Sequence, residues 1–282
     1  MKTQSFGSFI SRSLIRIFLA FWSLTVIFPL VWLVYSSLKN NREFYESPWK
    51  LPDVLRLENY QNAWVTANIS SYFLNSLIVV FGALVFYLIM STTTSYILAK
   101  YKFRSVKFFQ NFYLAAMMIP GVLLLVPLYY QMLALKLTDR LITLIILYAV
   151  QGVPFAVFIL TGFIKNIHNS FIEAALVDGA SEFNIFTKII LPFIKAPIFI
   201  VSLLNIMGSW NEFTTALTFI RDETKYTVPI GLSYLANTMQ YRTDFGALFA
   251  SLVISMVPVL VLYAFFQKQL QEGTAANEGV KG

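Results

Sequence analysis

Six long apolar runs constrain the fold of this chain more than any other feature of its sequence. A helix needs about 20 apolar residues to cross the hydrocarbon core of a bilayer, and each run reaches that length. The runs cover residues 17–38, 72–99, 108–135, 141–164, 193–220 and 245–266. Only 12% of the 282 residues are charged, whereas soluble domains have about 25%. The sequence therefore predicts an all-α, polytopic membrane protein with six transmembrane helices.

The first run is interpreted as a retained span and not as a cleaved signal peptide. Its apolar stretch is longer than that of a signal peptide, and the stretch from Tyr35 to Lys39 is a poor match to a small-residue cleavage site. No internal repeat or separate soluble domain is evident. We therefore expect residues 1–282 to form a single transmembrane domain.

The distribution of charge predicts that both termini lie in the cytoplasm. In that orientation more than half of the 21 Lys and Arg residues are cytoplasmic, and much of the remainder sits in the two longer loops, 39–71 and 221–244. The short loop 100–107 contains four basic residues and no acid. By the positive-inside rule, segment 165–192 is then also cytoplasmic. The net charge of +7 is read as a topology signal and not as a nucleic-acid interface, because the basic residues are scattered between apolar runs.

Prolines predict a bend in the third run, which Pro120–Gly121 and Pro127 interrupt. Proline removes a backbone hydrogen bond, and membranes tolerate this where neighbouring groups or water satisfy the freed carbonyl. Two interpretations are open at this stage. The run is either a bent packing helix or the bent wall of a central cavity.

Segment 165–192, between the fourth and fifth runs, has strong helix signals. Ser170 followed by Glu173 matches a capping box. Asp178–Gly179 predicts a helix stop with Gly179 at positive φ. The sequence therefore predicts a short helix followed by a tight turn.

After the turn, Ser181 is predicted to cap a second helix that Pro192 ends or kinks. The first helix is too short to persist alone in water. It is either an ordinary loop on the bilayer surface or a helix that docks into a groove of another protein. In the second interpretation two alanines allow close approach and three apolar residues act as anchors, namely Ala174, Ala175, Phe171, Ile172 and Leu176.

The chain contains little that supports an enzyme. It has no P-loop lysine motif, no Ser/His/Asp arrangement and no paired carboxylates on one span. It has no cysteine and a single histidine, His168, which excludes thiolate and multi-histidine metal sites. We therefore expect no catalytic residue, no metal site and no cofactor bound by this chain, and we interpret His168 as an interfacial polar residue.

Glu212 is the one conspicuous acid inside an apolar run, and it follows Trp210 and Asn211. At 1.5 Å per residue it lies roughly 10 Å from the outer end of its run. A charge at mid-bilayer costs about 2.5–3.5 kcal/mol on insertion scales, so the carboxylate should face protein or water. One interpretation is a paired acid that holds helices together. In the other, Trp210, Asn211 and Glu212 line a solute path, because sugars bind to aromatic faces beside hydrogen-bonding groups.

The segment around Glu173 resembles the EAA signature of binding-protein-dependent ABC importer permeases. Three residues separate the second alanine from the glycine, and nine separate the glycine from the closing apolar motif. Asp178 and Ala180 on either side of the glycine resemble the carbohydrate-uptake branch. The matching positions are Glu173, Ala174, Ala175, Gly179, Ile189, Leu191 and Pro192.

The resemblance to sugar permeases extends over essentially the whole chain. One departure is His168, where the family often has a proline before the signature. The further matching segments are Phe73–Ser76, Tyr96, Ala99–Lys100, Ile119–Pro120, Pro127–Tyr129, Pro154–Phe155, Gly162–Phe163, Trp210–Phe213 and Val280–Gly282.

The resemblance implies an ABC type I importer permease fold, similar to the shorter six-span permease of maltose-type sugar transporters. Such a permease pairs with a second permease, usually as a heterodimer, in the bacterial cytoplasmic membrane. An extracytoplasmic solute-binding protein delivers the sugar, and a cytoplasmic ATPase dimer binds ATP and Mg²⁺. The loop matching residues 221–244 reaches into the binding protein.

In this picture the coupling loop, residues 165–192, docks into the ATPase. Glu173 offers a charge to a basic partner, the two alanines permit close packing, and Gly179 makes the turn. The closing Leu191–Pro192 ties the loop to the fifth span. The implied ATPase-coupling residues are Glu173, Ala174, Ala175, Leu176, Asp178, Gly179, Leu191 and Pro192.

Three alternatives remain. Related permeases carry sugar-related solutes such as glycerol phosphates. An ion-coupled secondary carrier would need intramembrane acids in related halves, and only Glu212 is available. A membrane enzyme would need clustered histidines or carboxylates, which the sequence lacks.

Overall fold

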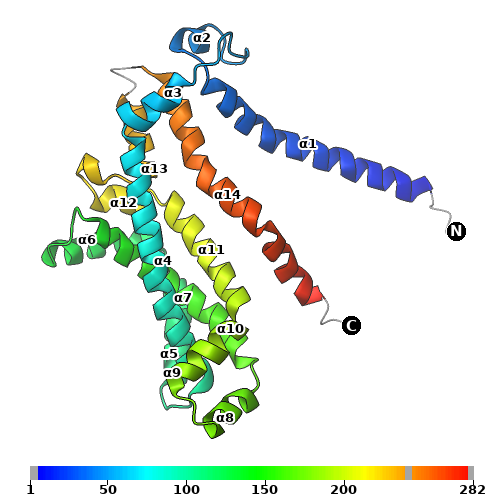
Figure 1. The fold of residues 1–282 in the computed structure, drawn as a ribbon, viewed down its shortest axis with the longest axis vertical. Helices are drawn as coiled ribbons and strands as arrows, with labels where there is room; N and C mark the ends of the chain where they lie inside the picture. Colours follow the sequence, from blue (N-terminus) through cyan, green and yellow to red (C-terminus); the bar gives the residue numbers. More distant parts are fainter. Residues whose placement is uncertain (1–5, 239–242, 279–282) are drawn as a thin grey trace. The chain divides into compact units, whose positions relative to one another are not determined.

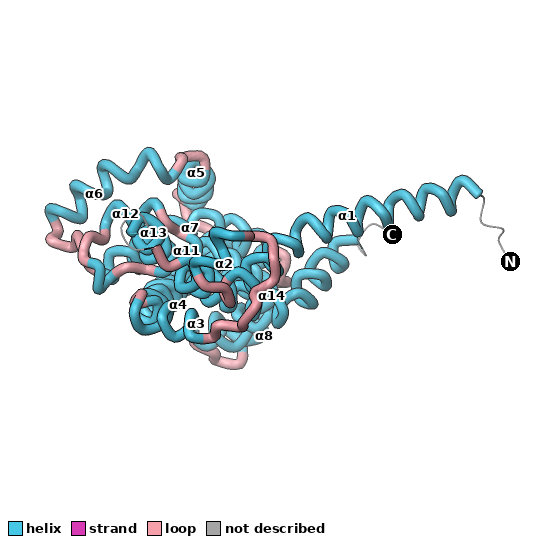
Figure 2. Tube along the Cα trace, turned by 90° about the horizontal axis from the view of Figure 1, so that it is seen from above, coloured by secondary structure: helices cyan, strands magenta, loops and turns pink. Residues whose placement is uncertain are grey.

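The computed structural model describes residues 6–238 and 243–278, and side chains over 13–238 and 243–267. Lys2 and the Val280–Gly282 ending lie outside the described residues, as do residues 239–242 of the second long loop. Helices joined by loops make up the described chain, with no strand among its elements (Figures 1 and 2). These residues fall into two compact units: Met1–Ile69 with Leu232–Val257, and Ser70–Gly231 with Pro258–Gly282.

Four described helices are long and apolar enough to cross a membrane, and the number is up to six if each of two bent helix pairs counts as one span. The all-α, six-span prediction is therefore confirmed. The four long helices are α1 (Phe6–Ser36), α4 (Ile69–Lys100), α7 (Leu141–Lys165) and α14 (Phe245–Glu278).

The first unit contains α1, the start of α14 and the folded loop between α1 and α4. The loop forms α2 (Asn41–Glu46), α3 (Glu58–Gln61) and a π turn, η1 (Asn62–Thr66). Asn41 ties α2 to the start of α14, because its Nδ2 donates to the Thr243 carbonyl at 2.7 Å and its Oδ1 accepts from the Phe245 amide at 2.9 Å. The Phe44 ring lies 4.6 Å from that of Phe245.

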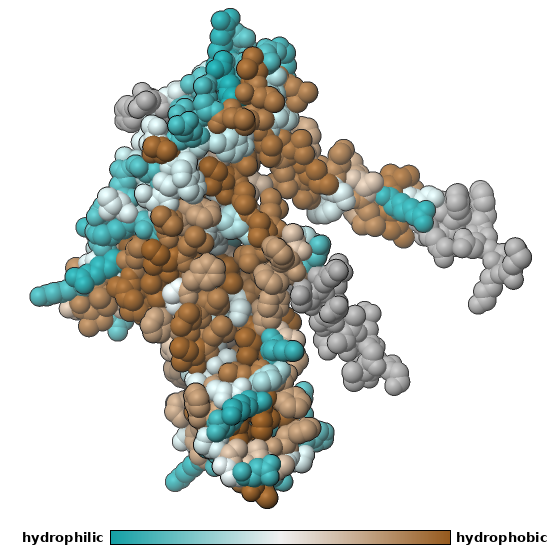
Figure 3. Space-filling view, viewed as in Figure 1, coloured by the Kyte–Doolittle hydropathy of each residue, from teal (hydrophilic) through white to brown (hydrophobic). Residues whose placement is uncertain are grey.

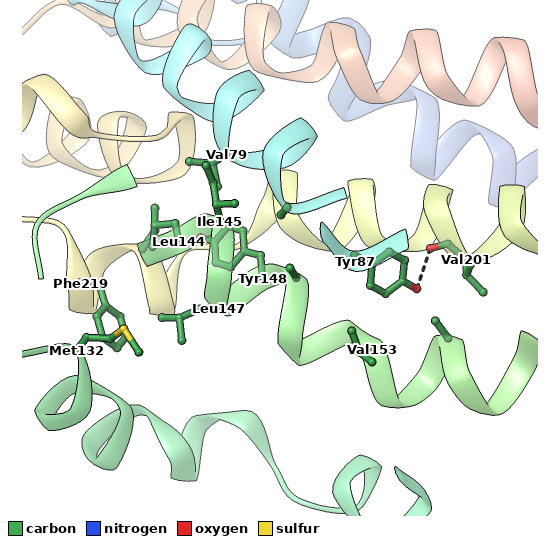
Figure 4. Packing of buried hydrophobic residues seen from close by; sticks show 14 of the residues in the cluster. Val79, Tyr87, Met132, Leu144, Ile145, Leu147, Tyr148, Val153, Val201 and Phe219 are labelled. Carbon is green, nitrogen blue, oxygen red and sulfur yellow. Dashed lines mark hydrogen bonds between the residues drawn. The ribbon is translucent and has the colours of Figure 1, made fainter. Parts of the chain in front are cut away.

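The second unit is built around α7. Half of its span is buried inside the chain, compared with 28% for α4. Figure 4 shows Tyr148 and Val153 of α7 packed among Tyr87 of α4, Val201 and other buried residues.

Shorter elements connect the long helices of this unit. In chain order, the first of them are α5 (Val106–Met117), η2 (Gly121–Leu124), α6 (Leu125–Ala134), α8 (Asn169–Val177), α9 (Glu182–Ile185), η3 (Phe186–Ile190) and α10 (Leu191–Phe193). The remainder are α11 (Lys195–Asn211), α12 (Thr214–Phe219), η4 (Glu223–Lys225) and α13 (Val228–Thr238), of which α13 continues into the first unit.

The third apolar run is a broken span and not one helix over 108–135. The segments Val106–Met117 and Gly121–Ala134 meet at 97°. Pro120 has an extended backbone, with φ −62° and ψ 123°, and proline disfavours a helical residue before it. Pro127 causes no break, because it lies in the first turn of α6, where its missing amide leaves no intrahelical bond unmade. The predicted bend is confirmed at Pro120 and was wrong at Pro127.

Hydrophobic side chains cover the middle of the second unit, and hydrophilic ones gather towards the end that carries α8 (Figure 3). Such a distribution is typical of a body that spans a bilayer and ends in water. It places α8 at a polar end of this unit.

Candidate functional site

The helix α8 begins two residues earlier than the predicted capping box requires. Its N-cap is His168, whose backbone is extended and whose side chain makes no capping bond. Ser170 is therefore already helical, and Glu173 lies too far along the helix to reach the cap amide. The Ser170–Glu173 capping box was wrong, because the extended backbone that a cap needs occurs at His168.

The end of α8 follows the sequence prediction. Gly179 has φ +77°, a region that a glycine adopts without steric cost. The Gly179 amide donates to the Leu176 carbonyl at 3.0 Å, and the Ala180 amide donates to the Ala175 carbonyl at 2.9 Å. These two bonds form a Schellman motif, so the predicted helix stop is confirmed.

The second helix of the coupling loop also begins as predicted. Ser181 caps α9, because its Oγ accepts from the Asn184 amide at 3.3 Å. The helix then widens into the π turn η3 before Pro192, and a bend of 77° separates Glu182–Phe193 from Lys195–Asn211. A π turn is one way to accommodate a missing backbone donor. The predicted kink is therefore confirmed.

The exposed surface of α8 carries three large apolar side chains. Phe171 and Leu176 are about half exposed, and Val177 is 89% exposed. Glu173 and Ala174 are also exposed. Exposed large apolar side chains rimmed by polar ones are typical of a protein interface. Val177 was missed by the sequence analysis, although it stands beside the signature glycine.

The other face of α8 packs inward. Ile172 and Ala175 contact a buried cluster, as do Ala180 and Leu191. Of the three predicted anchors, Ile172 therefore supports the loop from within, whereas Phe171 and Leu176 remain available outside. The cluster consists of Tyr96, Ile164, Ile167, Ile185, Ile190 and Ile194.

The end of α4 holds the coupling loop at two places. The Lys100 ammonium donates to the Ile167 carbonyl and to the Asn169 side-chain oxygen. The Tyr96 hydroxyl donates to the Glu182 carboxylate at 3.0 Å. We call these bonds, on either side of α8, the α4 clamp. Sequence analysis quoted Tyr96 and Lys100 only as matches to a pattern, and the structure supplies their contacts.

A cavity of about 260 Å³ lies between α4, α7 and α11. Its walls combine aromatic rings with hydrogen-bonding groups and contain no basic side chain. The residues used below are Tyr148, Gln151, Phe155, Asn205, Ser209 and Glu212. Gln151 and Asn205 were missed by the sequence analysis, although a polar side chain inside an apolar run is a signal for such a site.

The helix in the fifth apolar run, α11, ends at Asn211, directly before Glu212. The Glu212 backbone is extended, with φ −71° and ψ 120°. Its carboxylate accepts from the amides of Thr215 at 2.8 Å and Ala216 at 3.0 Å, at the start of α12. The predicted continuous span over 193–220 was therefore wrong, because Glu212 supplies the cap of a new helix.

Glu212 also joins two spans. Its Oε2 accepts from the Tyr148 hydroxyl of α7 at 2.8 Å. Three donors thus stabilise the half-buried carboxylate without a cationic partner. The two interpretations of Glu212 are compatible, because the same carboxylate ties α7 to α12 and lines the cavity.

Trp210 and Asn211, the two residues before Glu212, do not line the cavity. Trp210 is 5% exposed, and its ring lies 5.4 Å from that of Phe73 in an edge-on contact. Asn211 is exposed, and its Nδ2 donates to the Met207 carbonyl at 2.8 Å. The cavity includes Glu212 but neither neighbour.

A polar knot joins the loop before α7 to the loop after α12. Asp139 accepts from the amides of Arg221 at 3.0 Å and Asp222 at 3.1 Å, and from the Lys225 ammonium at 3.1 Å. Burial of the carboxyl opposes ionisation, but these donors outweigh it and hold the pKa of Asp139 below its ordinary value. Over the described residues, no group of three or more His, Asp or Glu side chains is placed to hold a metal ion.

The comparisons with known proteins agree on one class. A family model described as "Binding-protein-dependent transport system inner membrane component" matches residues 91–275. The diacetylchitobiose uptake system permease protein NgcG of Streptomyces coelicolor is 36% identical over 252 residues, covering 89% of this chain and 83% of the relative. The arabinooligosaccharides transport system permease protein AraQ of Halalkalibacterium halodurans is 32% identical over 273 residues, covering 95% and 96%.

Solved structures share the fold. A bacterial ABC transporter involved in the import of alginate superposes with a TM-score of 0.83 at 20% identity, over 95% of this chain and 99% of that chain. A second alginate ABC transporter structure, in complex with a periplasmic protein that carries an alginate pentasaccharide, gives 0.65 at 15% identity, over 91% and 92%.

Proposed function

Because the chain belongs to the family of binding-protein-dependent transport system inner membrane components, we propose that it is the permease subunit that conducts a neutral sugar in an ATP-driven importer. Members of this family are transport subunits of ABC importers and not enzymes. They work with an ATPase and a solute-binding protein. The sugar, the path and the coupling residues are the parts that we propose.

The cavity beside Glu212 carries the proposal. Sugars offer hydroxyl groups on their edges and weakly polar faces that pack on aromatic rings. The Phe155 and Tyr148 rings stand beside the polar groups of Gln151, Ser209 and Glu212. The Asn205 Oδ1 is buried and has no hydrogen-bond partner among the described residues. A sugar hydroxyl would satisfy this acceptor, whose burial without a partner is costly.

The charge of the cavity favours a neutral sugar over an anion. Glu212 places a carboxylate at the wall, and the lining contains no lysine or arginine. A glycerol phosphate would face like charge there without a cationic partner. The related permeases named for diacetylchitobiose and arabinooligosaccharides support the same substrate class.

Coupling follows from the exposed face of α8. In the proposed assembly, α8 docks into a cytoplasmic ATPase, ATP and Mg²⁺ bind to that partner, and both termini of this chain lie in the cytoplasm. Glu173 and Asp178 provide charge, and Phe171, Leu176 and Val177 provide apolar contact. ATP binding favours one arrangement of the ATPases, and a conformational change requires such a difference in affinity between two states.

A second permease completes the proposed path. Nearly the whole span of α1 is unburied within the described chain, with only Ser36 at its end buried, so lipid or another subunit must cover it. We infer a heterodimer with a related permease, with the external binding protein delivering the sugar to both.

Gly208 offers a direct test of the path. A β-carbon at Gly208 meets no atom within 4 Å, so Gly208→Leu should fold and project into the cavity. The transporter would be reconstituted in vesicles with its partner subunits and binding protein. Diacetylchitobiose, an arabinooligosaccharide and glycerol 3-phosphate would serve as probes of ATP-driven uptake.

We expect one of the neutral sugars to be transported, and Gly208→Leu to reduce its uptake by at least about tenfold, equivalent to about 1.4 kcal/mol. Gly208→Ala is the matched control and should retain uptake. Undiminished uptake in Gly208→Leu would remove the cavity from the path. Uptake of glycerol 3-phosphate alone would overturn the proposed substrate.

A further inference from the structure

A second cavity, of about 220 Å³, lies between the end of α4, α5 and the last turns of α7. It is several-fold larger than the about 30 Å³ that one water occupies in the liquid. Its walls are largely apolar and include the polar side chains of Gln110, Thr161 and Lys165. The residues that matter here are Leu98, Gln110, Phe158, Thr161, Gly162 and Lys165.

Thr161 marks the polar part of this cavity. It is 6% exposed, and its hydroxyl has no hydrogen-bond partner in the described part of the chain. A helical threonine normally bonds back to the carbonyl four residues earlier. Here the Val157 carbonyl instead accepts from the Ser95 hydroxyl at 3.4 Å. A ligand with a polar group would supply the partner that Thr161 lacks.

Basic residues stand in the last turn of α7 and in the segment after α4, the two helix ends that line the cavity. Lys165, in the last turn of α7, is exposed at the rim. The loop that joins α4 to α5 adds the exposed Lys102 and Arg104, the exposed Lys107 follows in the first turn of α5, and residues 101–107 contain no acid. A ligand that occupies the cavity is therefore expected to carry negative charge near these residues.

The apolar part of this cavity fits a hydrocarbon chain. Leu98 and Phe158 line the cavity together with Thr161. No residue of α5 is fully buried, and its neighbouring Phe108 and Phe112 are 66% and 57% exposed. This side of the unit is open to an apolar environment. The cavity thus combines an apolar slot, a buried hydroxyl and a basic rim over the last turns of one span.

We propose that this cavity binds an anionic phospholipid of the cytoplasmic leaflet. One acyl chain lies along Phe158, the ester region meets Thr161 and Gln110, and the phosphate pairs with Lys165. Basic pockets between transmembrane helices on the cytoplasmic side bind anionic headgroups by the same physics. The proposal uses the predicted orientation of loop 100–107 and does not depend on the sugar.

Photo-crosslinking tests the proposal on the complete transporter in lipid nanodiscs. The probes are phosphatidylglycerol and phosphatidylcholine, each with a diazirine on the acyl chain, and labelled peptides of α5 and α7 are measured by mass spectrometry. Three variants address the site. Lys165→Gln removes the charge, Thr161→Val removes the hydroxyl, and Gly162→Leu fills the slot, since a β-carbon there meets no atom within 4 Å.

We expect phosphatidylglycerol to label these peptides in preference to phosphatidylcholine. Lys165→Gln should reduce the labelling by about fivefold, the effect of one lysine near an anionic surface, and Gly162→Leu should abolish it. Thr161→Val should also reduce it. The control Lys195→Gln removes an exposed lysine from the start of α11 and should leave labelling unchanged, as should Gly208→Leu in the first cavity.

Equal labelling by the two lipids would overturn the proposal. Unchanged labelling in Gly162→Leu would also overturn it. Crosslinks showing that a side chain of another subunit fills the cavity would do the same. Elution and thermal unfolding of each variant establish that the transporter is intact. Because the readout is lipid labelling, it is independent of whether the transporter moves a sugar.

Discussion

Gly179 ends α8, the proposed docking helix, with a backbone conformation that other residues adopt only under strain. Its φ of +77° falls in the left-handed region, where a side chain costs roughly 1–2 kcal/mol. Space is not the obstacle, because a β-carbon there meets no atom within 4 Å. We expect Gly179→Val to distort the end of α8 and to lower uptake per ATP hydrolysed, measured as paired uptake and hydrolysis rates in vesicles.

Gly179→Asn is the matched control, because asparagine tolerates the left-handed region better than a β-branched residue does. It should retain most of the coupling. If Gly179→Val and Gly179→Asn lose the same amount of coupling, the glycine is needed for contact with the partner and not for its backbone conformation. Normal coupling in Gly179→Val would contradict the role of the turn.

At the residue scale, backbone requirements were more predictable than side-chain partners. Gly179 could be predicted because few residues tolerate its conformation. Ser170 could not be placed, because a cap depends on which residue is extended, and that residue proved to be His168. The three donors of Glu212 come partly from Tyr148, 64 positions away, and no local pattern encodes such a contact.

At the scale of elements, the α4 clamp connects the coupling loop to a span that does not adjoin it in sequence. Lys100→Met removes the bonds to Ile167 and Asn169. Hydrogen bonds to charged groups contribute about 1.5–3 kcal/mol each, less where exposed. We expect the variant to assemble with the ATPase but to transport several-fold less sugar per ATP, because movement of α8 reaches α4 less directly.

Lys102→Met serves as the control for this variant, since Lys102 is an exposed lysine of the adjoining loop. Tyr96→Phe should weaken coupling in the same direction by removing the bond to Glu182. If Lys100→Met and Tyr96→Phe both transport as much sugar per ATP as Lys102→Met and the native protein, the clamp has no part in coupling.

The polar knot around Asp139 predicts how the stability of the loop before α7 and of the loop after α12 depends on pH. The folded pKa of Asp139 is lowered from an ordinary value of about 3.9. Its stabilising contribution is therefore present above that pH and is lost as the pH falls through the lowered value. The bond to Asp222, then that to Asp139, raises the pKa of Lys225. Its contribution is present below the ordinary lysine value of about 10.4 and is lost above its raised pKa.

Hydrogen exchange of residues 221–226 should therefore be protected to a constant degree between about pH 5 and 9, after correction for intrinsic rates. Asp139→Asn should increase exchange at the Arg221 and Asp222 amides at pH 7, because the charge that strengthens those bonds is removed. Exchange in the native protein that rises between pH 5 and 7 would contradict this assignment.

Element boundaries were predictable where proline fixes them and not where a distant contact does. Pro120 breaks the third run as predicted. The end of α11 at Asn211 has no proline or glycine beside it, and it depends on Glu212 as a cap. Apolar length alone therefore gave the number of spans but missed this break.

At the scale of the whole molecule, α7 connects the proposed sugar path with the proposed ATPase-docking helix. Tyr148 and Gln151 line the first cavity, and the same helix ends at Lys165, four residues before α8 begins. In the proposed mechanism this helix contacts the sugar and adjoins the docking helix, so that motion can pass between the two sites along it. The sequence could not show this, because the pairing of α7 with α4 and α11 arises only on folding.

Orientation gives the last prediction, and the absence of cysteine makes it simple to measure. Val177, 89% exposed on α8, and Leu55, 67% exposed in loop 39–71, should lie on opposite sides of the membrane. In intact cells a membrane-impermeant maleimide should label Leu55→Cys and spare Val177→Cys. Inside-out vesicles should reverse the pattern, and adding the ATPase should protect Val177→Cys, because α8 is then covered. Labelling of Val177→Cys from outside would place α8 away from ATP and overturn the proposed coupling, whereas failure of the ATPase to protect it would remove Val177 from the docking surface.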